Sequence, residues 1–466
     1  MFFWAALIRG PVFFWAALIR GPVFFLAALI RGPVFFGRFP GPKWVGSEAS
    51  STLAGHMAAT EYEAVPAVDA DAEAPHVGTL VLKFGGTSVA DPDKLKRVAA
   101  RLVAAREEGH RVVGVLSAMG RTTDQLLDLA HQVSPTPHPR ELDMLVSVGE
   151  RISCALAAMA IHDLGHEAIS LTGSQAGIVT DTVHGKAKIV EVRARRIHEA
   201  LDEGTIVLVA GFQGVSTAFE VTTLGRGGSD TTAVALSAAL GADHCEIYTD
   251  VRGVYSADPR VVSNARRLTR VSFDEMLEMA SSGARVMATR SIEVARSHNV
   301  RLHVRSSFEE GDGTWIEEED VEMLEKALIS GVVHQREETV YRVDGAKAAQ
   351  LFGALAQASV NVDTIVQTSA EIVFSAPVED KDDAARTLDS LGGVTWSSRD
   401  DLGKVSLVGA GMKSHPGVAA KTFATLEQAG IEALIVSTSP IKIACHVPSA
   451  DVDKAVRALH EAFDLG

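Results

Sequence analysis

Two glycine-rich segments hold the residues best suited to chemistry in this sequence, KFGGTS at 83–88 and TTLGRGGSDTTA at 222–233. In the first, Gly85 and Gly86 leave backbone N–H groups open to an anion, and Lys83 supplies a positive charge beside them. In the second, glycines lead straight into an expected helix, whose N-terminus favours negative charge. Each segment alone could be a tight turn, but the pair within one domain predicts a phosphate-binding site.

Other phosphate-binding signatures are absent, because the sequence has no GxxxxGK[ST] loop and no protein-kinase set of glycine loop, HRD and DFG. The segment TDVRGVYSADPR at 249–260 offers a loop that could enclose a base and ribose, although a turn rich in capping residues explains it equally well. Glu150 and Arg151 interrupt an otherwise apolar helical stretch. Since a buried charge is costly unless paired, one of them is expected to meet a ligand or an ion-pair partner.

These segments need a scaffold of alternating strands and helices, and the chain from 78 to about 305 has that pattern. Continuous apolar runs predict buried strands, and amphipathic stretches that begin at Asp91-Pro92 or end in glycine predict helices. In such an α/β domain, loops at the carboxyl ends of the strands form the ligand crevice, where both glycine segments fall. The expected strands are 79–84, 111–118, 167–171, 205–212 and 244–250, and the expected helices are 92–108, 141–165 and 230–242.

Behind this domain the chain changes character. Two shorter units, 351–369 and 422–439, resemble each other, and each suggests a ferredoxin-like βαββαβ fold. A duplicated small domain after a large α/β domain is typical of a regulatory appendage. The predicted organisation is a leader at 1–46, a linker at 47–77, the α/β domain at 78–308, a solvated charged connector at 309–326, and small domains at 327–399 and 400–466.

The composition excludes several classes of protein. With 47% hydrophobic and 22% charged residues among 466, the chain is globular, and its net charge of −15 argues against a general nucleic-acid binder, which needs a basic surface. Cys154, Cys245 and Cys445 form no CxxC pair, so neither a disulfide framework nor a cysteine zinc site is expected, and a reducing cytosol fits. The 16 histidines show no ligand spacing, so no metal site built from protein side chains is predicted.

Residues 1–46 are an apolar leader built on an 11-residue repeat, FFWAALIRGPV twice and FFLAALIRGPV once. An Arg-Gly-Pro break ends each apolar run well before the roughly 20 residues that a spanning helix needs. We expect a poorly structured extension outside the working protein, with translation starting near Met57, and association with a membrane surface is the alternative. Residues 47–77 are small, acidic and turn-rich, which predicts a flexible linker.

Eight motifs follow one another from about residue 78 to the C-terminus: KFGGTSV, SAMG, DMLVSVGERIS, TGSQAGIVT, VAGFQG, TTLGRGGSDTTAVALSAALGAD, EIYTDVRGVYSADPR and VGAGMKSHPGV. In content and order they resemble the aspartokinase family. The resemblance implies a layered α/β domain of the amino acid kinase type followed by two ferredoxin-like ACT domains. It also implies Mg²⁺-dependent transfer of the γ-phosphoryl group of ATP to the β-carboxylate of L-aspartate. This is the first step of the diaminopimelate route to lysine, threonine and methionine, carried out by a cytoplasmic homo-oligomer joined through ACT domains, without a membrane or nucleic-acid partner.

The chemistry accounts for the residue types. A carboxylate with a pKa of about 3.9 is already ionised at neutral pH, so catalysis rests on positioning and charge neutralisation rather than on a general base. The resemblance implies that Lys83 contacts the transferring phosphoryl group and that Asp230 organises the reacting groups. It also implies that Arg226 binds the substrate α-carboxylate and that Glu150 binds the substrate ammonium. Ser117 and Ser229 would supply hydroxyl contacts.

The resemblance also supplies a nucleotide site and an effector site. The nucleotide positions are Lys83, Phe84, Gly85, Gly86, Gly227, Gly228, Ser229, Tyr248, Thr249, Val254, Tyr255, Ser256, Ala257, Asp258, Pro259 and Arg285. The effector positions, for threonine or lysine, are Asn361, Val362, Asp363 and Gln367.

Some positions depart from the family pattern. Arg285 stands where the family usually has a nucleotide-contacting lysine, so the charge is kept but the ammonium geometry is not. Loops of the first ACT unit are shortened, and Glu432, Ala433 and Pro440 replace the usual residues of the second. We therefore expect feedback inhibition to be weak or altered.

Other functions remain as alternatives. One is a catalytically weak, amino-acid-binding regulatory subunit that has kept the kinase shell. A kinase of another small carboxylate or carbamate is disfavoured, because Glu150 and Arg226 suit both ends of an α-amino acid. The stretch VSLVGAGMKSHPG at 405–417 mimics a dinucleotide fingerprint, but the 49 residues after it are too few to complete a Rossmann domain.

Overall fold

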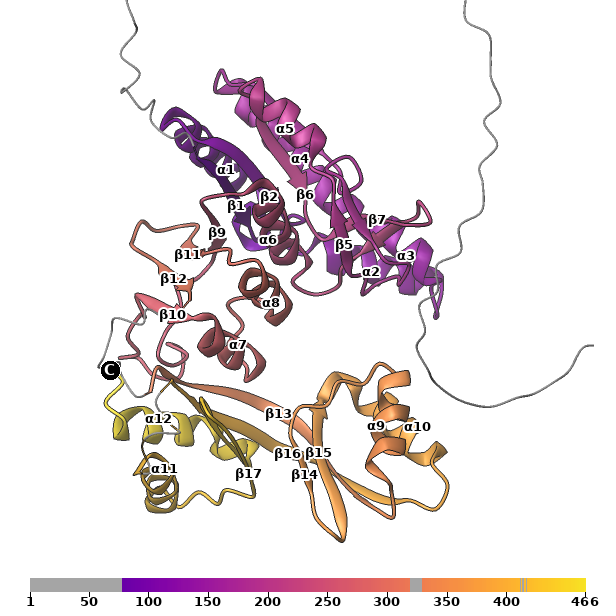
Figure 1. Cartoon of the computed structure of the whole chain (residues 1–466), viewed down its shortest axis with the longest axis vertical. Coiled ribbons are helices and arrows are strands. Elements are labelled where there is room, and N and C mark those ends of the chain that lie inside the picture. The colour runs from indigo at the N-terminus through magenta and orange to yellow at the C-terminus, as the bar shows by residue number, and fades with distance from the viewer. Residues whose placement is uncertain (1–77, 319–328, 411, 413–414, 416) are drawn as a thin grey trace, which may run out of the picture. The chain divides into compact units, whose positions relative to one another are not determined.

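The computed structural model describes residues 78–318, 329–410, 412, 415 and 417–466 (Figure 1). The predicted leader 1–46, the linker 47–77 and the part of the connector at 319–326 lie outside these residues. Strands of the described chain form sheets of eight, four and six strands.

The largest sheet contains β1 (Thr79–Phe84), β2 (Arg111–Leu116), β3 (Ala168–Leu171), β6 (Ile206–Ala210), β9 (His244–Thr249), β10 (Arg270–Ser272), β11 (Leu302–Ser306) and β12 (Thr314–Glu317). Their order is β10-β12-β11-β9-β1-β2-β6-β3. β1 pairs in parallel with β2 and β9, and all six of its residues are buried. A parallel strand covered on both faces must be apolar nearly throughout, which explains the run TLVLKF.

β12 corrects one expectation. The sequence predicts a solvated connector over 309–326, but Thr314–Glu317 pairs with β10 and β11. Thr314 and Ile316 are buried, whereas the residues between and after them are partly exposed. This period of two is a strand signal that the surrounding acidic residues obscure.

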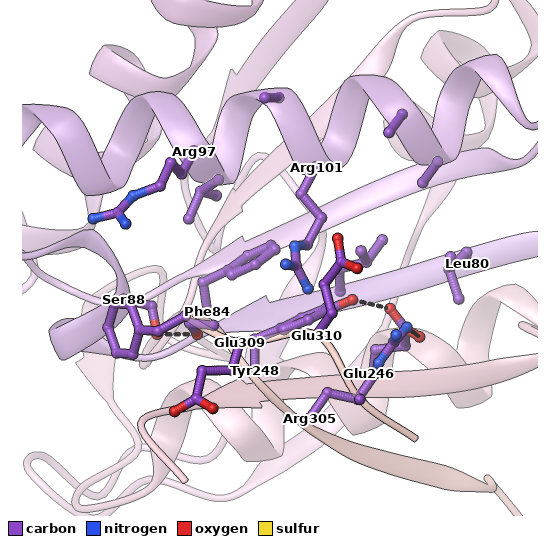
Figure 2. A pocket seen from close by; sticks show the side chains of 18 of the residues that line it. Leu80, Phe84, Ser88, Arg97, Arg101, Glu246, Tyr248, Arg305, Glu309 and Glu310 are labelled. Atoms are coloured by element: carbon purple, nitrogen blue, oxygen red, sulfur yellow. Dashed lines mark hydrogen bonds and ion pairs between the residues drawn. The ribbon is translucent and has the colours of Figure 1, made fainter. Parts of the chain in front are cut away.

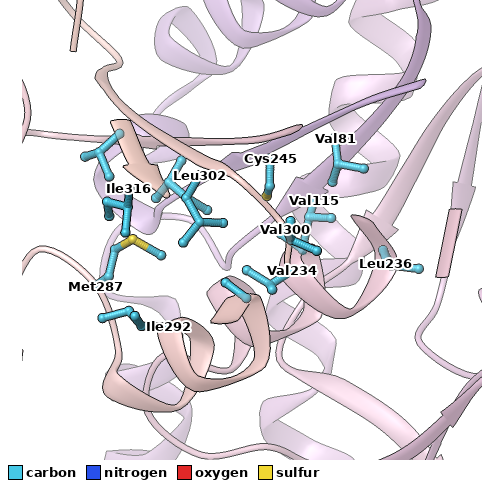
Figure 3. Packing of buried hydrophobic residues seen from close by; sticks show 14 of the residues in the cluster. Val81, Val115, Val234, Leu236, Cys245, Met287, Ile292, Val300, Leu302 and Ile316 are labelled. Carbon is cyan, nitrogen blue, oxygen red and sulfur yellow. The ribbon is translucent and has the colours of Figure 1, made fainter. Parts of the chain in front are cut away.

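Helices cover both faces of the large sheet. The helices α1 (Pro92–Glu107) and α4 (Val148–Asp163) pack on one face, and α6 (Gly228–Leu240), α7 (Phe273–Ser281) and α8 (Thr289–Ser297) pack on the other (Figure 1). Because side chains alternate along a strand, Leu80, Leu82 and Phe84 join the α1 cluster while Val81 joins the α6 cluster (Figure 3). Lys83 therefore lies on the α6 face.

A smaller sheet borders the carboxyl edge, in the order β5-β4-β7-β8. It contains β4 (Ile178–Thr180), β5 (Ile189–Val192), β7 (Gln213–Ser216) and β8 (Val221–Thr223), accompanied by α2 (Thr122–Val133) and α3 (Pro139–Val146), whereas α5 (Arg195–Asp202) packs against β6 of the large sheet. The single helix predicted over 141–165 is divided at Ser147 into α3 and α4. By length and composition the stretch Pro139–Asp163 could cross a membrane, but half of its most apolar window is buried in the protein, as in a core helix.

The C-terminal part forms two ferredoxin-like units, as the internal repeat predicts. They contain β13 (Gly331–Asp344), α9 (Ala348–Gln357), β14 (Ile365–Gln367), β15 (Glu371–Pro377), α10 (Lys381–Ser390), β16 (Thr395–Val408), α11 (Gly417–Gln428), β17 (Ile435–Ser439), β18 (Lys442–Pro448) and α12 (Val452–Ala462). One sheet, β14-β15-β13-β16-β18-β17, runs through both units.

The long strands β13 and β16 are shared between the two units. Residues 338–344 of β13 pair with β15 of the first unit, and residues 331–335 pair with residues 404–408 of β16, which in turn pair with β18 of the second unit. A bulge next to Glu338 separates the two halves of β13. The predicted boundary between residues 399 and 400 therefore falls inside one continuous strand.

Candidate active site

The carboxyl ends of β1, β2 and β9 meet at one edge of the large sheet. There the Ser117 N–H donates to the carbonyl of Phe84 (3.1 Å), and the Gly85 N–H donates to the carbonyl of Tyr248 (3.3 Å). The loops that follow these strands are thus held side by side at the place where the sequence predicts a ligand crevice.

The two glycine-rich segments converge at this edge. Lys83 Nζ lies 2.5 Å from Asp230 Oδ1 on the first turn of α6, and the two side chains are only 11% and 9% exposed. A Cβ on Gly85 would lie 3.5 Å from Lys83 Nζ, so the ammonium group lies beside the glycine backbone. Gly227 at the start of α6 has a φ of 70°, and a Cβ there would meet Ala288 at 2.1 Å, so only glycine fits. A lysine, a glycine turn and a helix N-terminus together suit a phosphate group.

Glu150 lies next to this site with unused hydrogen-bonding capacity. It is 3% exposed, and its Oε1 accepts the N–H of Ala118, in the loop after β2, at 3.2 Å. Its Oε2 is buried and has no hydrogen-bond partner within the described residues. Burial raises the pKa of Glu150 to about 7, and the backbone N–H groups and Arg151 only partly offset this. Such a carboxylate can receive a positively charged group from a ligand.

The remaining substrate positions differ in exposure. Ser229 is buried at the start of α6, and Gly211 approaches it so closely that a Cβ there would lie 2.7 Å from Ser229 Oγ. Ser117 is half-buried at the end of β2. Arg226 is exposed, and its guanidinium has no hydrogen-bond or ion-pair partner in the described part of the chain. A free, forked cation beside a phosphate-type site can bind a carboxylate.

Asp143 is a buried carboxylate beside the second glycine-rich segment that the sequence reasoning missed. This carboxylate is 2% exposed and accepts hydrogen bonds from Thr223 Oγ1 (2.5 Å), His184 Nδ1 (2.7 Å) and the Gly185 N–H (3.1 Å). It therefore ties α3 to β8, the strand that leads into the second glycine segment. The available signal was a lone acid in the apolar stretch before Glu150, which predicts a buried and satisfied charge.

Phe84 and Tyr248 do not join the Lys83 site through their side chains. Their rings stack at a centroid distance of 4.8 Å on the α1 face of the sheet, opposite Lys83, and line a separate cavity (Figure 2). The alternation of side chains along β1 and β9 causes this, and only the backbone of these residues reaches the site edge.

The predicted nucleotide loop is partly engaged elsewhere. Ser256 Oγ donates to the carbonyl of Leu465 (2.8 Å) and lies 3.0 Å from His460 Nε2 in α12, and Ala257 is buried in the core of the second ferredoxin-like unit. These two side chains therefore anchor the C-terminus, which no local pattern could reveal. Among the other predicted nucleotide positions, Val254 is buried and its N–H donates to Thr314 Oγ1, and the carboxylate of Asp258 accepts a hydrogen bond from Arg260. Thr249 is the last residue of β9. Tyr255 is half-buried, and Pro259 and Arg285 are exposed.

The predicted effector positions lie around β14. Asn361 and Gln367 are exposed and Val362 is half-buried. Asp363 forms an ion pair with Lys404 of β16, a side chain that is 1% exposed and also binds Glu338 at 2.6 Å. The carboxylate of Asp363 is thus already partnered inside the protein.

Comparisons with known proteins agree with this architecture. A model of the amino acid kinase family matches residues 78–306, and a model of the ACT domain matches residues 405–463. The aspartokinase of Mycolicibacterium smegmatis is 52% identical over 406 residues, covering 83% of this chain and 96% of the relative. The aspartokinase of Geobacillus stearothermophilus is 47% identical over 399 residues, covering 84% and 98%. A crystal structure of E. coli aspartokinase III in complex with aspartate and ADP superimposes with a TM-score of 0.72 at 26% identity, covering 82% of this chain and 99% of that one.

Proposed function

This chain belongs to the aspartokinase family and is a kinase, and we propose that it transfers the γ-phosphoryl group of ATP to the β-carboxylate of L-aspartate, forming 4-phospho-L-aspartate and ADP. The observation that carries the proposal is the contact of Lys83 with Asp230, which joins the two glycine-rich segments at one edge of the sheet.

The phosphate groups of ATP would lie between these segments. Lys83 would neutralise charge on the transferring phosphoryl group, and the backbones of Gly85, Gly86, Gly227 and Gly228 would allow a close approach of phosphate oxygens. Ser229 adds a hydroxyl at the N-terminus of α6. Because the lysine and the helix end are fixed by packing, they need little rearrangement as charge develops.

Aspartate would be held at both ends of its backbone. Glu150 Oε2 would accept the substrate ammonium, Arg226 would bind the α-carboxylate, and Ser117 would contribute a hydroxyl contact. This leaves the β-carboxylate free as the nucleophile, already ionised and in need of no general base. Catalysis then depends on placing it in line with the γ-phosphoryl group.

The remaining assignments complete the proposal. The segment 249–259, with Thr249, Val254, Tyr255, Asp258 and Pro259, would enclose the nucleoside, and Arg285 would contact phosphate. Mg²⁺ would enter with ATP and neutralise phosphate charge, and the carboxylate of Asp230 is the group suited to orient that complex. We place the enzyme in the cytoplasm, at the entry to the diaminopimelate route to lysine, threonine and methionine, as a homo-oligomer that pairs through its ACT domains.

One assay tests the function. The purified full-length chain is incubated with L-aspartate, ATP and Mg²⁺, and acyl phosphate is trapped with hydroxylamine. We expect aspartate-dependent hydroxamate, and D-aspartate or L-glutamate should give far less. A correctly folded chain that forms no hydroxamate would support the alternative of a regulatory subunit. The comparison does not favour that alternative, because the chain covers 96% of the M. smegmatis aspartokinase.

A further inference from the structure

A cavity lies on the α1 face of the large sheet, away from Lys83. It has a volume of about 800 Å³ and is bounded by α1, β1, β9, the end of β11 and the loop at 307–312 (Figure 2). His244 and Glu246 line it, and the rings of Phe84 and Tyr248 form part of its wall. Glu150 and Ser229, the helix residues proposed to bind the substrate, are not among the residues that line it.

Three potential metal ligands lie together beside this cavity, and two of them, His244 and Glu246, line it. His244 and Glu246 are two residues apart on β9 and point to the same face, and His303 is directly opposite Glu246 in the register of β11. The ligand atoms of these side chains all lie within 4.8 Å of one another. Two imidazoles and one carboxylate are a ligand set suited to Zn²⁺ and related transition-metal ions.

The separations fit a coordination sphere better than direct hydrogen bonds. Glu246 Oε1 lies 3.6 Å from His303 Nδ1 and 3.8 Å from His244 Nε2. Both distances exceed the usual N–H···O range of about 2.7–3.2 Å. Ligands bound at about 2.0–2.1 Å around a tetrahedral ion lie roughly 3.4 Å apart. Small side-chain adjustments would therefore seat an ion between the three atoms.

The hydrogen bonding of His303 favours a cation at this position. Its Nε2 lies 2.7 Å from the carbonyl oxygen of Asp312, and because a carbonyl only accepts, Nε2 must carry the proton. In the neutral ring the Nδ1 lone pair then faces the Glu246 carboxylate, an arrangement that a bound cation would stabilise. Trp315 stacks on the ring at a centroid distance of 4.0 Å and fixes its orientation. A histidine held through its second nitrogen by a carbonyl is the usual arrangement behind a metal ligand.

Glu246 is prepared as an anionic ligand. It is 5% exposed, and it accepts hydrogen bonds from Arg305 (2.8 Å) and from the hydroxyl of Tyr248 (2.8 Å). Arg305 donates to the same Oε1 that faces His244 and His303, so the groups around this position are one carboxylate, two imidazoles and one guanidinium.

We propose that His244, Glu246 and His303 bind one divalent transition-metal ion, with Zn²⁺ the best match and solvent from the cavity completing its coordination. The ion would cross-link β9 to β11 and, through His303 and Asp312, fix the loop at 307–312. The site is independent of the proposed kinase reaction and lies on the opposite face of the sheet from the lysine that serves it.

The test is a titration of the untagged, metal-stripped full-length chain with ZnCl₂, followed by calorimetry, with CoCl₂ as a spectroscopic probe. We expect saturable binding of one ion per chain in the presence of millimolar Mg²⁺, and visible Co²⁺ absorption typical of low coordination number. His244→Ala, His303→Ala and Glu246→Gln should each weaken Zn²⁺ binding by at least about tenfold. His110→Ala, which alters the wall of the same cavity, should leave the affinity unchanged.

Thermal unfolding of each variant without metal separates loss of a ligand from loss of the fold. Zn²⁺ should raise the midpoint of the wild type and of His110→Ala, but not that of His303→Ala. Absence of saturable binding by the wild type, or equal affinity in the wild type and in folded His244→Ala and His303→Ala, would overturn the proposal in favour of a metal-free ion-pair network around Glu246.

Discussion

Lys83 Nζ and Asp230 Oδ1 lie 2.5 Å apart, although 147 positions separate them in the chain. The contact joins the end of a central strand to the first turn of α6. Because both groups are nearly buried, each stabilises the charge of the other, and the removal of either leaves an uncompensated charge.

Lys83→Gln should lower kcat by about 10²–10³-fold, because the variant loses the cation that stabilises the transferring phosphoryl group. The KM for aspartate should change much less. Steady-state hydroxamate kinetics measure both quantities. Lys96→Gln is the matched control, since Lys96 is exposed on α1, and it should behave as the wild type. A Lys83→Gln enzyme with wild-type kcat would contradict the assignment.

Glu150 should make aspartate binding depend on pH. Its pKa is raised to about 7 by burial, so the ionised form that binds the substrate ammonium is lost as the pH falls below about 7. The KM for aspartate should rise in that range for the wild type. Glu150→Gln should have a KM at least about tenfold higher, without this inflection. A wild-type KM that stays flat between about pH 6 and pH 8 would disprove the role.

The same group should affect stability in the opposite sense. The folded protein favours the protonated carboxyl, so stability is lost as the pH rises from the unfolded pKa of 4.5 to the folded pKa of about 7. Glu150→Gln removes this loss, and at about pH 8 its free energy of unfolding should exceed that of the wild type by up to about 3 kcal/mol. Urea unfolding at about pH 5 and pH 8 measures the difference, which should fall to about 1 kcal/mol or less at the lower pH.

Asp143→Ala should destabilise the protein by about 3 kcal/mol, because Thr223 and His184 lose a buried, charged acceptor. Aspartate turnover should fall as well, since β8 leads into the second glycine segment. Denaturant unfolding and kcat/KM report the two effects. Asp128→Ala, on the exposed face of α2, serves as the control and should change neither. Unchanged stability in Asp143→Ala would show that the carboxylate does not organise this region.

Feedback inhibition by threonine or lysine should be weak. Asp363, an expected effector contact, is paired with the buried Lys404, so an amino acid would have to displace that ion pair. Inhibitor titrations at saturating ATP should show shallow inhibition. Cooperative shut-off at micromolar threonine or lysine would contradict this. Lys404→Met should in addition lower stability by about 3 kcal/mol, because Glu338 would stay buried without its ammonium partner and with His446 as its remaining contact.

The core of the fold could be predicted because its signals are local. The strand at 79–84 is a continuous apolar run, and Asp91 caps α1 by accepting the N–H of Lys94, with Pro92 in the first turn. The convergence of Lys83 and Asp230 also follows, since Lys83 lies at the carboxyl end of one parallel strand and a helix that leads into a neighbouring parallel strand begins at that same edge of the sheet.

Long-range pairings escaped the sequence reasoning. The bond between Ser256 and Leu465 joins positions 209 residues apart, and neither residue type signals the other. His244 and His303 come from two strands and meet only through the register of β9 and β11. The spacing of these two residues along the chain could therefore not reveal them as a pair. The prediction that protein side chains form no metal site used only the spacing of the histidines in the sequence.

The long strands β13 and β16 limit where this protein can be truncated or joined to parts of its relatives. A version ending before Thr395 would lose all of β16 and leave the backbone of β13 unpaired along the parts that belong to both units. Exchange of this C-terminal part between related proteins should therefore transfer residues 331–466 together, because one sheet runs through both of its units.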